Sequence, residues 1–318
     1  MARLEERVPE YLAGLRVDQG LAELFDDYSR SKLQTWIKDG RVLINGLIPK
    51  PKDRLEGGEQ VELEAEPELV TTCEAENIPL DIVYEDEALI IVNKPAGLVV
   101  HPAQGNWSGT LQNALLNHDA NLATLPRAGI VHRIDKDTSG LLMVAKTLQA
   151  HHSLVDQLQE RSIEREYLAV TKGRMISGGT VDEPIGRHPT ERKQFAVRMS
   201  GGKDAVTHYR VIERFTRHSF IQVQLETGRT HQIRVHMAHI KFPLIGDPMY
   251  GGRFQMPANC SEHLKVILKN FKRQALHAAK LGLVHPLTDE YMEWEQDIPD
   301  DMHELLEALR DNDAQQLA

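Results

Sequence analysis

The densest group of potentially reactive side chains is in VHRIDKDTSG, residues 131–140, where two aspartates flank a lysine. An apolar run, LLMVAK, follows at once, so Asp135 would lie where a buried strand begins. Burial raises the pKa of a carboxyl group and weakens it as a nucleophile, whereas a neighbouring guanidinium keeps it ionised. Asp135 is therefore a candidate nucleophile with Arg133 or Arg229 as its partner, although an ion pair that only fixes the loop would give the same pattern. Asp137, in KDTSG, fits a turn residue.

Two other stretches can complete a site with this one: REYLAV at 165–170 and ETGRTHQIR at 226–234. Tyr167 lies in an expected strand, where it could stack on a nucleobase or simply pack in the core. A glycine precedes Arg229 at an expected strand-to-helix corner, which exposes backbone N–H groups and directs the arginine into a cleft. The histidines 231, 236 and 239 do not share one helix face, and no carboxylate completes a zinc pattern, which argues against a metal site.

The elements that must position these residues follow from hydrophobic periodicity. Strands are expected at 88–93, 140–147, 165–174, 207–215 and 219–229. Helices are expected at 108–119, 148–163 and 230–240, the last with Thr230 as its N-cap. Many strands between few helices favour an α+β fold with a mixed, mostly antiparallel sheet flanked by helices. Residues 302–318 are expected to form a frayed acidic helix.

The N-terminal part reads as a small α+β unit with a basic face. Two short helices, the second capped by Ser29, precede a small sheet with a tight turn at Asn45-Gly46. Arg30, Lys32 and Lys38 share one face of the second helix, which suits a nucleic-acid contact. The predicted domains are therefore 1–66 and 81–318, joined by an acidic linker at 67–80.

The charge of the 318-residue chain is unevenly distributed. Residues 286–318 carry eleven Asp and Glu and one Arg, which accounts for the whole net charge of −10, because 36 basic and 36 acidic residues remain. Residues 28–54 hold seven Lys and Arg against two Asp, and residues 127–254 hold twenty against thirteen. Solvated surfaces would explain such clusters, but nucleic-acid contacts would too. Two cysteines without metal-type spacing and the lack of a long apolar run lead us to expect a reduced, cytoplasmic protein without a membrane partner.

Both predicted domains resemble known protein families. The N-terminal unit resembles the S4 domain of RNA-binding proteins at Arg16, Asp18, Leu21, Ser29, Arg30, Ser31, Gly40, Val42, Asn45 and Gly46. The stretches HRIDKDTSG, REYLAV and TGRTHQIRVHMAH, together with YEDEALIIVNKPAGLVVHP and RQALHAAKLGLVHP, resemble the pseudouridine synthases of the RluA type. Among these, the chain is most similar to bacterial enzymes that act on large-subunit ribosomal RNA. Ile134 stands where leucine is commoner, a change that keeps volume.

The resemblance implies an isomerase of ribosomal RNA processing that converts uridines of 23S ribosomal RNA to pseudouridine, with the helix 69 stem-loop as the expected target. It implies that Asp135 attacks a flipped uridine, that Arg229 pairs with Asp135, and that Tyr167 stacks on the uracil. Further RNA contacts are implied for Arg133, His132, Ile233, Arg30, Lys32 and Lys38. The reaction is redox-neutral, so neither a cofactor nor a metal is expected. The expected partner is 23S ribosomal RNA or a precursor of the large subunit, bound by a monomer.

Two other functions remain open from the sequence. A non-catalytic S4-type RNA-binding factor would use the large domain as a scaffold and would not need Asp135. A glycoside hydrolase would need a second carboxylate across a sugar site. The stretches REYLAV and ETGRTHQIR offer arginine and tyrosine instead of that second carboxylate.

Overall fold

The computed structural model describes residues 2–25, 30–65, 73–103, 105–191, 193–253, 255–257 and 259–317. The chain divides into two compact units, Met1–Thr72 and Cys73–Ala318. The expected cap Ser29, the side chain of Lys32 and residues 66–72 lie outside the described part. Residues 73–80, expected to be linker, belong to the second unit, where Glu76 accepts hydrogen bonds from the backbone N–H of Gly109 at 3.0 and 3.2 Å.

The first unit is a three-stranded antiparallel sheet with two helices. Its elements are β1 (Ala2–Arg7), the 3-10 turn η1 (Glu10–Leu12), α1 (Val17–Leu24), α2 (Arg30–Lys38), β2 (Val42–Ile44) and β3 (Gln60–Ala65). The strand order is β1-β3-β2. Asn45 and Gly46 have φ of 49° and 76° and form the expected tight turn. Apolar residues of both helices, including Leu21 and Leu33, pack with Val61 of β3 into one core.

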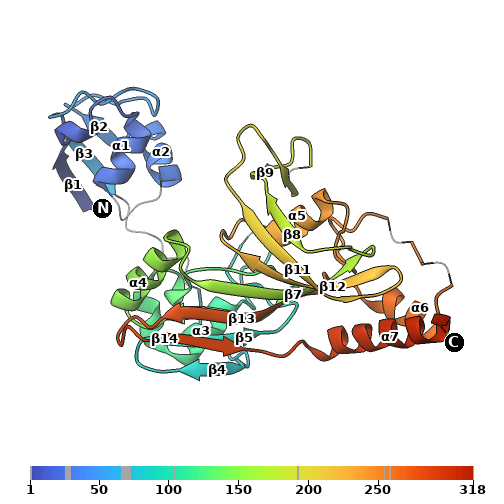
Figure 1. The fold of residues 1–318 in the computed structure, drawn as a ribbon. Coiled ribbons are helices and arrows are strands. Elements are labelled where there is room, and N and C mark those ends of the chain that lie inside the picture. Colours follow the sequence, from blue (N-terminus) through green and yellow to red (C-terminus); the bar gives the residue numbers. More distant parts are fainter. Residues whose placement is uncertain are drawn as a thin grey trace. The chain divides into compact units, whose positions relative to one another are not determined.

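The second unit is built on a nine-stranded sheet (Figure 1). Its strands are β4 (Ile82–Glu85), β5 (Leu89–Lys94), β6 (Ser139–Ala145), β7 (Glu164–Lys172), β8 (Gly179–Asp182), β11 (Val206–Arg214), β12 (His218–Leu225), β13 (Leu276–Val284) and β14 (Tyr291–Glu295). They lie in the order β4-β5-β6-β13-β7-β12-β11-β8, and β14 pairs with β13. Among the pairings between these strands in the described residues, that of β6 with β13 is the parallel one. The mixed, mostly antiparallel α+β fold expected from the sequence is confirmed.

In the described part of this unit, a second, two-stranded sheet and five α-helices accompany the large sheet. They are β9 (Ile185–Arg187) with β10 (Phe195–Val197), and α3 (Leu111–His118), α4 (Leu148–Gln159), α5 (Gln232–His239), α6 (Glu262–Asn270) and α7 (Asp300–Leu317). The side chains of β5 alternate between two cores. Ile90 and Val92 pack in the core that includes residues of α3 and α5, whereas Leu89 and Ile91 pack in the core that includes residues of α4. Every residue of β6 is buried, because helices cover both faces of the sheet there.

Helix α7 is packed rather than frayed, so that expectation is wrong. Met302, Leu305, Leu306 and Leu309 are at most 2% exposed and lie in one core with residues of α6. Their spacing of three and four residues forms a single apolar stripe along an otherwise acidic helix. A bidentate pair from Arg273 to Asp301, at 2.6 Å, ties the start of α7 to the loop before β13. Within the described residues, no helix has both the length and the apolar character needed to cross a membrane.

Candidate active site

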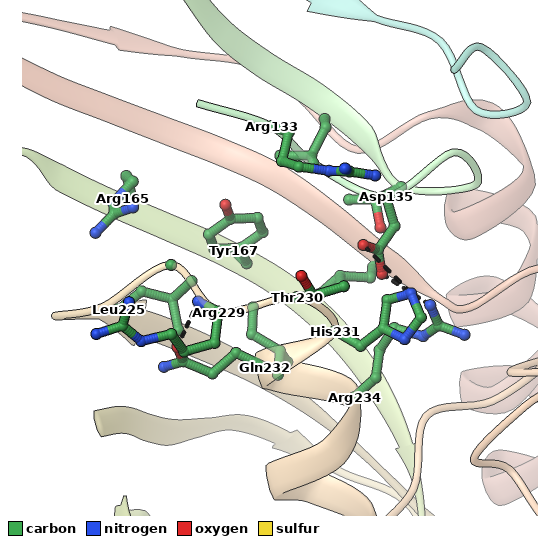
Figure 2. A pocket seen from close by; sticks show the side chains of 15 residues that line it. Arg133, Asp135, Arg165, Tyr167, Leu225, Arg229, Thr230, His231, Gln232 and Arg234 are labelled. Carbon is green, nitrogen blue, oxygen red and sulfur yellow. Dashed lines mark hydrogen bonds and ion pairs between the residues drawn. The ribbon is translucent and has the colours of Figure 1, made fainter. Parts of the chain in front are cut away.

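The three stretches singled out in the sequence meet in one pocket of the second unit (Figure 2). The loop before β6, strand β7 and the turn between β12 and α5 form its wall. The lining residues are Arg133, Ile134, Asp135, Thr138, Arg165, Tyr167, Leu225, Gly228, Arg229, Thr230, His231, Gln232, Ile233, Arg234 and Leu276. Asp135 is the carboxylate among these residues, so any carboxylate chemistry in the pocket depends on it.

Asp135 is held by one arginine through one of its oxygens. Arg234 donates from Nη1 to Oδ2 of Asp135 at 2.8 Å, and the same guanidinium donates to both oxygens of Asp247, at 2.7 and 3.0 Å. Burial alone would lower the pKa of Arg234, but hydrogen bonds and charges from Asp247 and Asp135 outweigh it and raise that pKa. The Asp135 side chain is 18% exposed, and Oδ1 faces His231 Nε2 at 3.9 Å. This geometry orients the carboxylate through Oδ2, and the partly exposed side chain lines the pocket.

The expected pairing of Arg229 with Asp135 is wrong in this structure. Arg229 lines the pocket, but its Nε donates to the backbone oxygen of Asp204 at 2.9 Å. The reason is the turn before α5, because the sequence placed the N-cap of this helix one residue too early. His231, and not Thr230, is the N-cap, with left-handed φ 58° and ψ 21° and no side-chain capping bond. This turn directs Arg229 away from Asp135 and places Arg234, in the first turn of α5, beside it (Figure 2).

Gln232 and His231 fix this turn. The Gln232 side-chain oxygen accepts hydrogen bonds from the backbone N–H of Arg229 at 3.0 Å and from Thr227 Oγ1 at 2.7 Å. His231 Nδ1 lies 2.8 Å from the hydroxyl of Tyr250, which accepts a hydrogen bond from the Phe195 N–H at 2.9 Å. Burial lowers the pKa of His231, so the imidazole is neutral at pH 7.

The sequence missed four residues of this arrangement: His231 as a pocket residue, Arg234, Asp247 and Tyr250. The signal for Arg234 was present, because ETGRTHQIR contains a second arginine close to the buried positions of α5, and a buried arginine needs carboxylates. Asp247 and Tyr250 follow in GDPMYGG, which carried no separate chemical signal.

Tyr167, Ile233 and Arg133 all line the pocket, as expected from the sequence. Tyr167 is 7% exposed, and burial raises the pKa of its phenol, so the ring stays uncharged. Ile233 adds an apolar surface and is buried. Arg133 is exposed, and in the close-up it lies near Asp135 (Figure 2). The pocket therefore combines a flat ring, an apolar wall and a carboxylate.

His132 is placed differently from its predicted role in substrate binding. Its Nε2 accepts a hydrogen bond from the backbone N–H of Met143 at 3.0 Å, and it is not among the residues that line the pocket. Burial lowers the pKa of His132 to about 3, so the ring is a neutral acceptor. The histidine secures the approach to β6 rather than facing a ligand. In the described residues, no three His, Cys, Asp or Glu side chains gather in a way that could hold a metal ion.

The basic helix face of the first unit is only partly available to a ligand. Arg30 donates from Nε and Nη2 to the same oxygen of Asp18, at 3.0 and 2.7 Å, and its side chain stays 46% exposed. Lys38 is exposed at the end of α2. Part of the Arg30 charge is therefore compensated within the unit.

Comparisons with known proteins match both units. Residues 88–239 match the RNA pseudouridylate synthase family, and residues 15–61 match the S4 domain. The chain is 56% identical over 309 residues to the protein of Escherichia coli (strain K12) named ribosomal large subunit pseudouridine synthase D, covering 97% of this chain and 94% of that protein. The protein of the same name from Pseudomonas aeruginosa is 54% identical over 310 residues, with 98% and 97% covered.

Two solved structures are similar in fold to this chain. Human RNA pseudouridylate synthase domain containing 4 is 25% identical with a TM-score of 0.57, covering 72% of this chain and 92% of that one. Human RNA pseudouridylate synthase domain containing 1 is 26% identical with a TM-score of 0.55, covering 77% and 98%. The family match at 88–239 includes the Asp135 loop, β7 and α5, which supply most of the pocket wall.

Proposed function

The chain belongs to the RNA pseudouridylate synthase family, and from that premise we propose that it isomerises uridines of 23S ribosomal RNA to pseudouridine. The relatives that are more than half identical over nearly the whole length are named for the large ribosomal subunit. One observation carries the proposal: the Asp135 carboxylate opens onto a pocket with one oxygen held by Arg234 and with the ring of Tyr167 in the same wall. This arrangement suits one flipped pyrimidine nucleotide.

In the proposed reaction, a uridine leaves its stack and enters the pocket, which costs a few kcal/mol and least in a loop. Asp135 acts with Oδ1 on the ribose, either at C1′ or on the C2′ proton. The N1–C1′ bond breaks, the base turns while bound, and C5 joins C1′. At that point the bond between Asp135 and C1′ breaks or, on the second route, C2′ regains its proton from Asp135. A proton leaves C5 and one is added to N1, so no atoms are gained or lost and no redox cofactor is required.

The neighbouring residues have binding roles in this proposal. Tyr167 stacks on the uracil, and Ile233 contacts its edge. Arg133, exposed beside Asp135, holds the RNA where the flipped base has left its stack. Arg234 supports the chemistry by fixing the orientation of Asp135, the role first expected of Arg229.

The proposed substrate is a stem-loop, with helix 69 of the large-subunit RNA as the candidate. The S4 unit adds phosphate contacts through Lys32 and Lys38 and through the exposed part of Arg30, and such contacts help to offset the cost of flipping. The protein acts as a monomer in the cytoplasm, where ribosomal RNA precursors are processed.

A direct test uses 23S ribosomal RNA transcribed with tritium at C5 of uridine. The purified protein should release tritium into water without releasing free uracil, and chemical mapping should then place pseudouridine in the helix 69 loop. A glycoside hydrolase would release uracil, and a non-catalytic RNA-binding factor would release neither. Either of those outcomes would refute the proposed activity, and pseudouridine elsewhere in the RNA would refute only the proposed target.

A further inference from the structure

Arg165 is a buried cation that the proposed mechanism has not used. It lies on β7, is 6% exposed, and its Nε has no hydrogen-bond partner. Its Nη2 donates only to the backbone oxygen of Glu226, at the long distance of 3.4 Å. The Glu226 carboxylate is engaged instead by Arg161 and His208, at 3.3 and 2.7 Å. In the described part of the chain, no carboxylate forms an ion pair with Arg165.

Such an arrangement is costly in the free protein. Burial lowers the pKa of Arg165, which shows the unfavourable environment of its charge. An unpaired buried guanidinium loses hydration without regaining hydrogen bonds. When a ligand binds and supplies a hydrogen-bond acceptor, the buried guanidinium regains the hydrogen bonds that it lost on leaving water.

The position of Arg165 indicates which ligand atoms it can reach. Arg165 and Tyr167 line the same pocket from alternate positions of β7, about 7 Å apart along the strand. Tyr167 lies between Arg165 and Asp135 in the close-up (Figure 2), and its pKa responds to the charges of both. The pocket therefore has a carboxylate on one side of the ring and an unpaired cation on the other.

Gly228 closes the wall over the guanidinium. A Cβ atom at this position would lie 2.9 Å from Nη1 of Arg165, so a larger residue would displace the guanidinium. Gly228 thus allows the close approach that keeps the Arg165 charge at the pocket wall.

We propose that Arg165 binds a carbonyl oxygen of the flipped uracil and stabilises the base anion that forms when the N1–C1′ bond breaks. This inference rests on the proposed function. The bonding electrons remain on the base and are shared between N1, O2 and O4. They then form the C5–C1′ bond, after which C5 loses its proton and N1 gains one. The base departs as an anion whether Asp135 attacks C1′ or removes the C2′ proton, so Arg165 serves either route.

A fixed cation is effective here for two reasons. Charge develops on the carbonyl oxygens only as the bond breaks, so the interaction is stronger in the transition state than with bound uridine. Arg165 is also buried, so less water surrounds its charge and screens it. A phosphate contact is the alternative for an arginine in an RNA enzyme, but Arg165 is only 6% exposed, which favours contact with a base inserted into the pocket over contact with a backbone phosphate.

The test combines a protein change with single-atom changes in the substrate. Single-turnover rates are measured for wild type and Arg165→Met on a stem-loop carrying uridine, 2-thiouridine or 4-thiouridine at the target. Arg165→Met should slow conversion of uridine about 100-fold or more, as removal of a donor to a developing oxyanion does, while RNA affinity changes less than about threefold. Because sulfur accepts hydrogen bonds poorly, the defect should shrink on the thio substrate whose carbonyl Arg165 contacts and persist on the other.

Three controls separate this role from others. Arg161→Met removes a nearby cation that is 44% exposed, and it should leave the rate within about twofold of wild type. Gly228→Ala keeps the Arg165 charge but displaces it, so its defect should be intermediate and should show the same dependence on the thio substrates. The melting temperature of Arg165→Met should be equal to or above that of wild type, because an unpaired buried charge is removed.

The remaining outcomes are decisive as well. An equal defect on all three substrates with weaker RNA affinity would assign Arg165 to a phosphate and overturn the proposal. A rate within threefold of wild type would overturn it too. If Arg165→Met failed to fold, the Gly228→Ala series would decide by the same criterion. Failure of wild type to form pseudouridine would instead refute the proposed function itself.

Discussion

Asp135 is the residue on which the proposed chemistry depends. Asp135→Asn keeps the shape of the side chain but removes the negative charge that Arg234 orients at 2.8 Å. We expect loss of at least about a thousandfold in the single-turnover rate, as is normal for a covalent or proton-transfer catalyst, with RNA affinity within a few fold. Tritium release from C5-labelled RNA measures the rate. Retention of more than about a hundredth of the wild-type rate would remove Asp135 from this role.

Asp137→Asn is the matched control for this change. Asp137 is two residues away, and its backbone oxygen accepts a hydrogen bond from Arg273 at 3.3 Å, so its main contribution is to the shape of the loop. Substitution of its side chain should leave the enzyme active. An inactive Asp137→Asn beside an active Asp135→Asn would reverse the roles of the two carboxylates.

The two arginines of the ETGRTHQIR stretch should differ strongly when each is replaced by lysine. Arg234 bridges Asp135 and Asp247 through three hydrogen bonds, and an ammonium cannot reproduce that planar fork. Arg234→Lys should therefore reduce the rate by about tenfold to a hundredfold, whereas Arg229→Lys should stay within about threefold. Rates would be compared for variants whose melting temperatures show that they are folded. Equal defects in both variants would mean that Arg229 contacts Asp135 in the RNA complex.

The sequence predicted which residues meet in the pocket better than it predicted their partners. Asp135, Tyr167 and Ile233 follow from motif position, because Asp135 precedes the buried run of β6, and Tyr167 and Ile233 lie within β7 and α5. The assignment of the arginine depended on one backbone angle. The left-handed residue His231, with φ 58°, is the N-cap of α5 one residue later than expected, and nothing in residue type marks that position.

At the scale of elements, alternation and apolar runs predicted five of the eleven strands that the structure describes in the second unit, but not their order. The buried run of β6 matches the strand expected at 140–147, whereas β12 ends at Leu225, four residues before the end of the strand expected at 219–229. The parallel pairing of β6 with β13 joins residues 139–140 to 277–278, and local pattern carries no information on such a distant partner. In α7, acidic composition obscured an apolar stripe that the spacing contained.

Helix α7 should contribute measurably to stability. Leu305 is fully buried, so Leu305→Ala leaves a cavity and should lower the free energy of unfolding by about 2–5 kcal/mol. Glu304→Ala, on the exposed face of the same helix, should change it by less than about 0.5 kcal/mol. Urea denaturation at constant pH measures both. If both substitutions changed the free energy of unfolding equally, α7 would be a frayed helix, as its composition led us to expect.

Lys94 should give the protein a stability that depends on pH. It ends β5, is fully buried, and donates from Nζ to the backbone oxygens of Pro95, Leu98 and Lys136, at 2.7, 3.0 and 3.0 Å. It therefore joins the turn after β5 to the Asp135 loop. Burial lowers the pKa of Lys94 from 10.5 to about 7.

The sign of the pH effect follows from proton counting. Between about pH 7 and 10.5 the unfolded chain holds a proton on Lys94 that the folded chain has released, so the free energy of unfolding rises with pH in that window. The slope is at most about 1.4 kcal/mol per pH unit. Lys94→Met lacks this contribution, so the difference in unfolding free energy between wild type and variant should grow from pH 7 upward. If the difference in unfolding free energy did not change with pH, the hydrogen bonds to the three carbonyl oxygens would fully offset the cost of burying the charged ammonium group.

At the scale of the whole molecule, charge separates the parts that can approach RNA from those that cannot. The C-terminal segment 286–318 carries the whole net charge of −10, while residues 28–54 and 127–254 are basic. RNA phosphates are repelled by the acidic segment and attracted to the basic ones, so the net charge of the chain does not conflict with a nucleic-acid substrate. The pocket belongs to the 127–254 region, and the S4 unit holds the other basic segment.

Removal of the S4 unit should therefore weaken RNA binding without abolishing catalysis. Deletion of residues 1–72 leaves the second unit with its own cores and with the Glu76 contact that anchors its N-terminal segment. The truncated protein should convert a short stem-loop at a rate within a few fold of the full chain, because the pocket is intact. Its affinity for ribosomal RNA should fall, and the slope of log affinity against log salt should become shallower by about 0.7–0.9 for each lost phosphate contact. Lys38→Ala is the matched point variant and should reduce the slope by about one contact. An unchanged slope after deletion would show that the S4 unit does not touch phosphate, and loss of activity on the short stem-loop would show that the unit is needed for the site itself.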